Sequence, residues 1–203
     1  RSRGVEVTVE AVIPHLVLDK TYAERPDFEG AKFVMSPPLR DAEEHNALWS
    51  GLESGSVSTI GTDHAPFNFN GQKDMGKDAF TLIPNGIPSI QERVDLVHTY
   101  GVCTGKFDLR KMVEVCSSNV AKQFNMYPRK GALIVGSDAD IVIYDTEYVD
   151  TFKHEEGLSN IDYSGFEGME RKGRSEVVLL RGKVVAKQGK FVGEVGSGEY
   201  ISR

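Results

Sequence analysis

The order of secondary structure in the first 128 residues is the strongest constraint on the fold. Residues 5–12 alternate and are rich in β-branched side chains, which predicts a strand. Residues 41–54 have a helical pattern that begins at Asp41 as the expected N-cap, and residues 56–62 read as a second strand. A strand, a helix and a strand at this spacing predict a parallel α/β architecture. Further helices are expected over residues 89–102 and 108–126.

The pattern changes near Pro128. Residues 130–146 and 175–196 consist of short alternating β segments, and glycine-centred turns are expected at 181–183 and 187–190. We therefore predict two domains, residues 1–128 and residues 129–203. The sequence between the two β-rich stretches, which includes "YSGFEGMERKGR", reads as an ordered surface loop or tail.

Composition narrows the class of protein. The 203 residues carry a net charge of −6, with 27% charged and 39% hydrophobic residues, as in ordinary globular proteins. No block of Lys or Arg predicts a surface for nucleic acid or an anionic membrane, and no apolar run reaches 18 residues. Cys103 and Cys116 lack metal-site spacing, so we expect buried, reduced thiols and a cytoplasmic protein.

The second strand ends abruptly in Asp63 and His64. Functional side chains of parallel α/β folds gather at the carboxyl ends of strands. Asp63 could bind a divalent metal and accept a proton there, or it could simply cap the turn. We expect His64 to orient Asp63 or its loop. The remaining histidines form no cluster in sequence, so Asp63 is one convincing ligand of an incomplete site. They are His15, His45, His98 and His154.

Two other rigid turns could lie near Asp63. Ser36 follows a short apolar segment, expected to be a strand, and precedes Pro37 and Pro38. Asn85 lies within "IPNGIP", at the end of a loop of about twenty residues, a length that is more often functional than incidental. Main-chain groups fixed by such turns suit a cyclic amide or imide, although ordinary turn chemistry also explains both residues.

Four stretches together resemble the C-terminal part of the dihydropyrimidinases and D-hydantoinases, the cyclic-amidase branch of the amidohydrolase superfamily. They are "SPPLR", "GTDHAPFNFNGQKDMGKDAFTLIPNGIPSIQERV", "KGALIVGSDADIVIYD" and "YSGFEGMERKG". The resemblance implies a TIM-like (β/α)8 barrel flanked by a small β-sandwich. Residues 1–128 are similar to the last βα units of the barrel, and residues 129–203 to the C-terminal share of the sandwich with a tail.

The same resemblance implies a site with two zinc ions. Family members hold them with an HxH pair, a carboxylated lysine, two further histidines and one aspartate. Only the aspartate matches this sequence, at Asp63, where it binds one metal and moves a proton to the leaving nitrogen. Ser36 and Asn85 match positions whose main chains hold the substrate ring. The other ligands are expected upstream of Arg1.

We therefore expect metal-dependent hydrolysis of the cyclic amide bond of dihydropyrimidines or hydantoins. The chain is expected to be part of a longer protein, inactive without its N-terminal part, and tetrameric as in the resembled family. "TDHAP" also resembles dihydroorotases, so dihydroorotase or allantoinase activity is an alternative. A non-catalytic scaffold of the dihydropyrimidinase-related type is another, although such relatives lose metal ligands and Asp63 is present.

Overall fold

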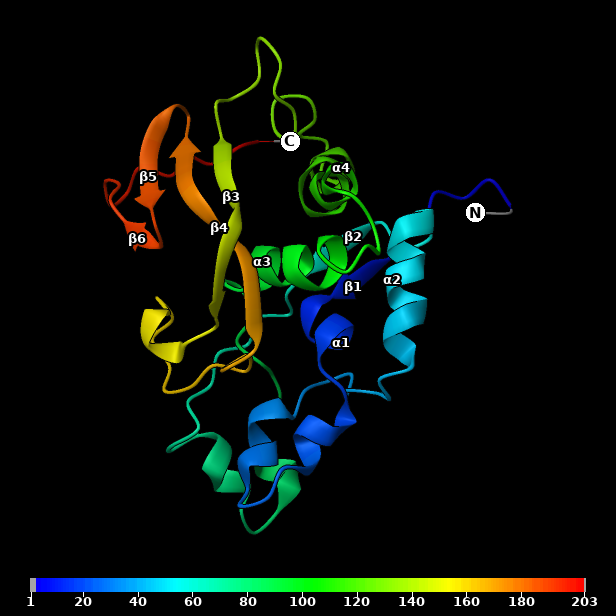
Figure 1. Ribbon diagram of the computed structural model, residues 1–203, viewed down its shortest axis with the longest axis vertical. Helices are drawn as coiled ribbons and strands as arrows, with labels where there is room; N and C mark the ends of the chain where they lie inside the picture. Colours follow the sequence, from blue (N-terminus) through cyan, green and yellow to red (C-terminus); the bar gives the residue numbers. More distant parts are fainter. Residues whose placement is uncertain (1–2, 203) are drawn as a thin grey trace.

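A short parallel sheet organises the first part of the chain. The computed structural model describes residues 3–202 (Figure 1). In it, β1 (Glu10–Val12) pairs in parallel with β2 (Thr59–Gly61), so that Glu10 lies opposite Thr59 and Val12 opposite Gly61. The connection contains α1 (Ile13–Val17), η1 (Lys20–Glu24), η2 (Glu29–Phe33) and α2 (Glu44–Ser54). The predicted parallel strand–helix–strand unit is therefore present.

Three local predictions for this unit are wrong. Residues 5–9 lie outside any sheet, although the Val9 carbonyl accepts the Ser58 N–H at 2.7 Å, and the alternating valines Val5, Val7 and Val9 are exposed. The apolar segment before Ser36 is a 3-10 helix, η2, rather than a strand. Asp41 does not cap α2, which begins at Glu44. The Asp41 carboxylate instead forms an ion pair with Lys20 at 2.6 Å.

The two later helical segments form as predicted but are interrupted by π-helical turns. The first runs through α3 (Arg93–Val97) and η5 (His98–Val102). The second runs through α4 (Leu109–Val113), η6 (Glu114–Ser118) and α5 (Asn119–Gln123), and begins where the Asp108 carboxylate accepts the Lys111 N–H at 2.8 Å. Two short 3-10 helices lie in the loop between β2 and α3, η3 (Lys73–Gly76) and η4 (Phe80–Leu82).

The second part of the chain is an antiparallel sheet. Its strands pair in chain order, β3 (Ile141–Thr151), β4 (Glu170–Leu180), β5 (Lys183–Lys187) and β6 (Lys190–Phe191). The predicted reversals are confirmed, because Arg181-Gly182 and Gln188-Gly189 adopt positive φ between consecutive strands. Residues 130–140 were expected to be β, but the first strand begins only at Ile141. A 3-10 turn, η7 (His154–Glu156), lies in the β3–β4 connection.

The two parts share a buried joint around α3, which lies between the two sheets (Figure 1). The carboxylate of Asp95 accepts hydrogen bonds from the Tyr144 hydroxyl at 2.9 Å and from Arg171 Nε at 2.9 Å. Burial raises the pKa of Asp95, and the Arg171 guanidinium opposes this shift. A buried, paired charge therefore joins α3 to β3 and β4.

The connection between β3 and β4 is part of the core rather than a surface tail, so that prediction is wrong. Tyr163 is 5% exposed, and Phe166 is fully buried in the same cluster as Ile87 and Leu96. The expectation of buried thiols fails for Cys103, which is free and exposed, whereas Cys116 is free and partly buried. Within residues 3–202, no helix has both the length and the apolar character needed to cross a membrane.

Phe166 gives a direct test of this packing. We expect Phe166→Ala to lower the free energy of unfolding by about 3–5 kcal/mol, because it removes a fully buried ring. Phe80→Ala is the matched control, since that ring is 80% exposed and its loss is expected to change stability by less than about 0.5 kcal/mol. Urea unfolding of both variants measures the difference; equal losses would contradict the assigned core.

Candidate functional site

Asp63 lies just beyond the carboxyl end of β2. Alternation along the paired strands places Glu10, Val12, Thr59 and Gly61 on one face of the sheet, while Ala11 and Ile60 face the core. Asp63 is exposed and adopts a φ of +50°, which is uncommon for a residue other than glycine. The Thr62 hydroxyl, rather than the Asp63 carboxylate, accepts the His64 N–H at 3.3 Å. Strain of this kind is a reason to propose a functional role.

His64 fastens the loop that carries Asp63. Its Nδ1 accepts the main-chain N–H groups of Ser89 at 3.0 Å and Ile90 at 3.2 Å. The Ser89 hydroxyl returns a hydrogen bond to the Thr62 carbonyl at 2.8 Å. Burial lowers the pKa of His64, which favours the neutral imidazole, whose Nδ1 can accept these bonds. His64 thus orients the loop as the sequence predicts, and it does so by acting as an acceptor.

Ser36 and Asn85 lie together although 49 residues separate them in sequence. The Ser36 hydroxyl donates to the Asn85 side-chain oxygen at 3.4 Å, and both residues are exposed. The next residue, Gly86, donates its N–H to the Val34 carbonyl at 2.9 Å. Gly86 also lies so close to Ala65 that an added Cβ would be 2.3 Å from the Ala65 Cβ. The Asn85 loop is therefore packed against both the Ser36 turn and the Asp63 loop.

Lys73 hydrogen-bonds to the segments that lead into Ser36 and Asn85, and sequence analysis missed it. The side chain is fully buried, and its Nζ donates to the carbonyls of Val34 at 3.2 Å and Pro84 at 3.0 Å. Burial lowers the pKa of Lys73 to about 8. A lysine in a glycine-rich loop carries no periodic signal, so only the tertiary structure distinguishes it from Lys77, which is exposed.

The C-terminal part of the chain also supports this region. The Asp162 carboxylate accepts the main-chain N–H groups of Phe69 at 2.6 Å and Asn70 at 3.0 Å. The Tyr163 hydroxyl donates to the Lys32 carbonyl at 3.2 Å. The start of the long loop after β2 is therefore fixed by Asp162, which lies more than 90 positions further along the chain.

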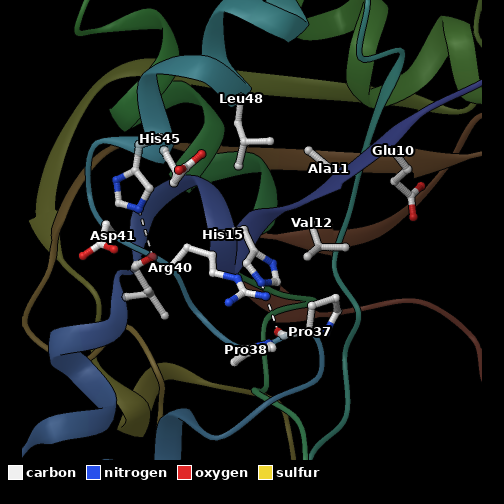
Figure 2. Close-up of a pocket in the computed structure, with 12 residues that line it drawn as sticks. Glu10, Ala11, Val12, His15, Pro37, Pro38, Arg40, Asp41, His45 and Leu48 are labelled. Atoms are coloured by element: carbon white, nitrogen blue, oxygen red, sulfur yellow. Dashed lines mark hydrogen bonds between the residues drawn. The ribbon is translucent and has the colours of Figure 1, made fainter.

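A separate cavity of about 360 Å³ opens beside β1 (Figure 2). It is bordered by Val12, the Pro37-Pro38 turn and the start of α2, and does not include Asp63, Ser36 or Asn85. Its two histidines are already engaged: His15 Nε2 lies 3.1 Å from the Pro37 carbonyl oxygen, and His45 Nε2 lies 2.9 Å from that of Leu18. In the described part of the chain, no group of three His, Cys, Asp or Glu side chains is placed to hold a metal.

Comparison with known proteins places this geometry in a family. The model of the amidohydrolase family matches residues 18–185. The chain belongs to the amidohydrolase family. Along its full length it is 42% identical to the D-hydantoinase of Geobacillus stearothermophilus. Its structure superposes on dihydropyrimidinase from Brevibacillus agri NCHU1002 with a TM-score of 0.97 and 47% sequence identity, over 100% of the chain. It superposes on D-hydantoinase (dihydropyrimidinase) from Thermus sp. with a TM-score of 0.94 and 52% sequence identity, over 98% of the chain.

These relatives are longer than the chain. It covers 43% of the Geobacillus stearothermophilus amidohydrolase, 44% of the Brevibacillus agri chain and 43% of the Thermus chain. The resemblance seen in the sequence motifs is thus confirmed across the whole chain, while the chain spans less than half of each of these proteins.

Gly86 tests how closely the loops of this site pack. We expect Gly86→Ala to destabilise the amidohydrolase chain by more than about 1 kcal/mol, because the new methyl meets the main chain of Ala65 at 2.8 Å as well as its side chain. Gly71→Ala is the control: it also replaces a positive-φ glycine, at +82°, but nothing lies within 4 Å. Thermal unfolding of both variants measures the difference, and a smaller loss for Gly86→Ala would contradict the described packing.

Proposed function

We propose that residues 1–128 are the last βα units of a TIM-like (β/α)8 barrel, and that residues 129–203 are part of a small β-sandwich with a tail. Two parallel strands cannot close a barrel, and Glu10, which shares a sheet face with Val12, is exposed. In the described residues the parallel sheet has only β1 and β2, so each strand keeps one edge at which a further barrel strand would pair. The N-terminal part of the same protein is thus the first partner of this chain.

The function we propose is metal-dependent hydrolysis of the cyclic amide bond of dihydropyrimidines or hydantoins. The observation that carries it is the packing of the Ser36 turn, the Asn85 loop and the Asp63 loop against one another. The names of the relatives, D-hydantoinase and dihydropyrimidinase, support this substrate class.

Asp63 fits the role of one metal ligand. Its carboxylate is exposed at the end of a parallel strand, and oxygen ligands suit divalent zinc when they are combined with histidine. The remaining ligands, including a carboxylated lysine, belong to the upstream part of the protein. Two bound zinc ions would supply Lewis acidity and an activated water at neutral pH.

Four residues of this chain have a definite task in the proposed reaction. Asp63 accepts a proton from the attacking water and delivers it to the ring nitrogen as the amide bond breaks. The main-chain groups at Ser36 and Asn85 hold the amide or imide of the ring, so the scissile carbonyl faces the reactive centre. His64 keeps the Asp63 loop fixed through Ser89 and Ile90.

We also propose that the protein is a cytoplasmic homotetramer. The free, exposed thiol of Cys103 is compatible with a reducing compartment. Val195 and Tyr200, which are 95% and 93% exposed, offer apolar contact area in the C-terminal tail.

Replacement of Asp63 tests the proton transfer. In the longer protein that contains this chain, Asp63→Asn is expected to lower kcat for dihydrouracil or hydantoin by at least about 1,000-fold, since the amide cannot accept the proton. Asp78→Asn, in the same loop and also exposed, is expected to keep kcat within about twofold. Steady-state kinetics of both variants decide the role, and activity retained by Asp63→Asn would refute it.

The isolated 203-residue chain gives a second test. It is expected to bind fewer than two zinc ions and to leave dihydrouracil intact, because it supplies one of the proposed ligands. Elemental analysis of a sample with verified intact mass, followed by an assay, measures both properties. Two zinc ions per chain together with turnover would show that the chain contains a complete site.

A further inference from the structure

Lys73 occupies an unusual position for a lysine. Its side chain has no exposed surface, and in residues 3–202 it forms no ion pair with a carboxylate. Its Nζ hydrogen bonds reach two main-chain carbonyls, those of Val34 and Pro84, and its own N–H donates to the Asn68 carbonyl at 3.0 Å. The ammonium group thus bridges two segments that are 50 residues apart.

Both of those segments lead directly into the proposed ring-binding residues. Val34 lies two residues before Ser36, and Pro84 immediately precedes Asn85. The Val34 carbonyl also accepts the Gly86 N–H, so hydrogen bonds hold the main chain on both sides of Asn85. The relative position of Ser36 and Asn85 therefore depends on three hydrogen bonds. Lys73 donates two of them, to the Val34 and Pro84 carbonyls, and Gly86 donates the third, to the Val34 carbonyl.

A buried charge without a counter-ion is costly, and an apolar side chain of similar size would fill the same space without that cost. Burial depresses the pKa of Lys73 to about 8, which reflects that cost. What the ammonium adds over a methionine is two directed donors. Filling of space alone does not account for a lysine here, whereas alignment of two carbonyls does.

We propose that Lys73 is a positioning residue for the substrate ring, which sets the spacing between the main-chain groups of Ser36 and Asn85. This proposal rests on the proposed hydrolase function for its kinetic consequence. Its structural consequence is independent of that function: loss of the Lys73 donors loosens the Gly86 contact with Val34.

The kinetic test uses the longer protein that contains this chain, with hydantoin or dihydrouracil as substrate. Lys73→Met is expected to raise KM about tenfold or more at unchanged zinc content, because misplacement of binding groups by a fraction of an ångström weakens ring binding. Lys77→Met, an exposed lysine four residues later, is the matched control and is expected to leave KM unchanged. A KM for Lys73→Met within twofold of the control overturns the proposal.

The structural test uses hydrogen exchange of the Gly86 amide, and needs no activity. In Lys73→Met this amide is expected to exchange about tenfold faster or more than in Lys77→Met, while the amides of the β3–β4 pair keep their rates. Faster exchange at Gly86 in Lys73→Met, together with a wild-type protein that hydrolyses neither ring, would retain the positioning role and reject the proposed function. Unchanged exchange at Gly86 would reject the positioning role itself.

A second variant covers a failure of Lys73→Met to fold. Lys73→Gln keeps two N–H donors on a shorter side chain and removes the charge. If Lys73→Met folds, Lys73→Gln is expected to show a smaller rise in KM and in the Gly86 exchange rate than Lys73→Met. If Lys73→Met does not fold, the KM and the Gly86 exchange rate of Lys73→Gln are expected to exceed those of Lys77→Met. Values equal to those of Lys77→Met would overturn the proposal.

Discussion

The in-register parallel pairing of β1 with β2 is the constraint on which the rest of the structure depends. Because parallel strands run in the same direction, their carboxyl ends meet at one edge of the sheet. The pairing of Glu10 with Thr59 and of Val12 with Gly61 fixes which side chains share a face. A shift by one residue would move every side chain of β2 to the opposite face and change the direction in which Asp63 leaves the strand.

The loops beyond that edge are held by polar contacts in addition to the buried apolar side chains of Met35 and Ile87. His64 accepts two main-chain N–H groups, Lys73 donates to two carbonyls, and Asp162 accepts two more N–H groups from the start of the long loop. Each of these contacts satisfies main-chain groups that no strand or helix pairs, which is a condition for an ordered loop of this length. The loop can therefore be both irregular and precisely placed.

The C-terminal sheet contributes to the same region through its connection rather than through its strands. Phe166 packs in the cluster that contains Ile87 and Leu96, and Tyr163 reaches the Lys32 carbonyl. Asp95 and Arg171 complete the joint as a buried pair with Tyr144. Such a pair adds little stability by itself, but it defines the orientation of α3 relative to β3 and β4.

The sequence by itself determined the alternation of strand and helix, the β-rich second part with its glycine turns, and the family, because these depend on local periodicity and on motifs. It also suggested Asp63, Ser36 and Asn85 as site residues, which stays a prediction. Only the tertiary structure decided that β1 is three residues long, since regular pairing with β2 covers Glu10–Val12 alone and the valines before it stay exposed. It also placed Ser36 beside Asn85 and revealed the roles of Lys73 and Asp162. The physical reason is that the burial of a side chain and the partners of a polar group are set by segments far away in the chain, about which the local pattern carries no information.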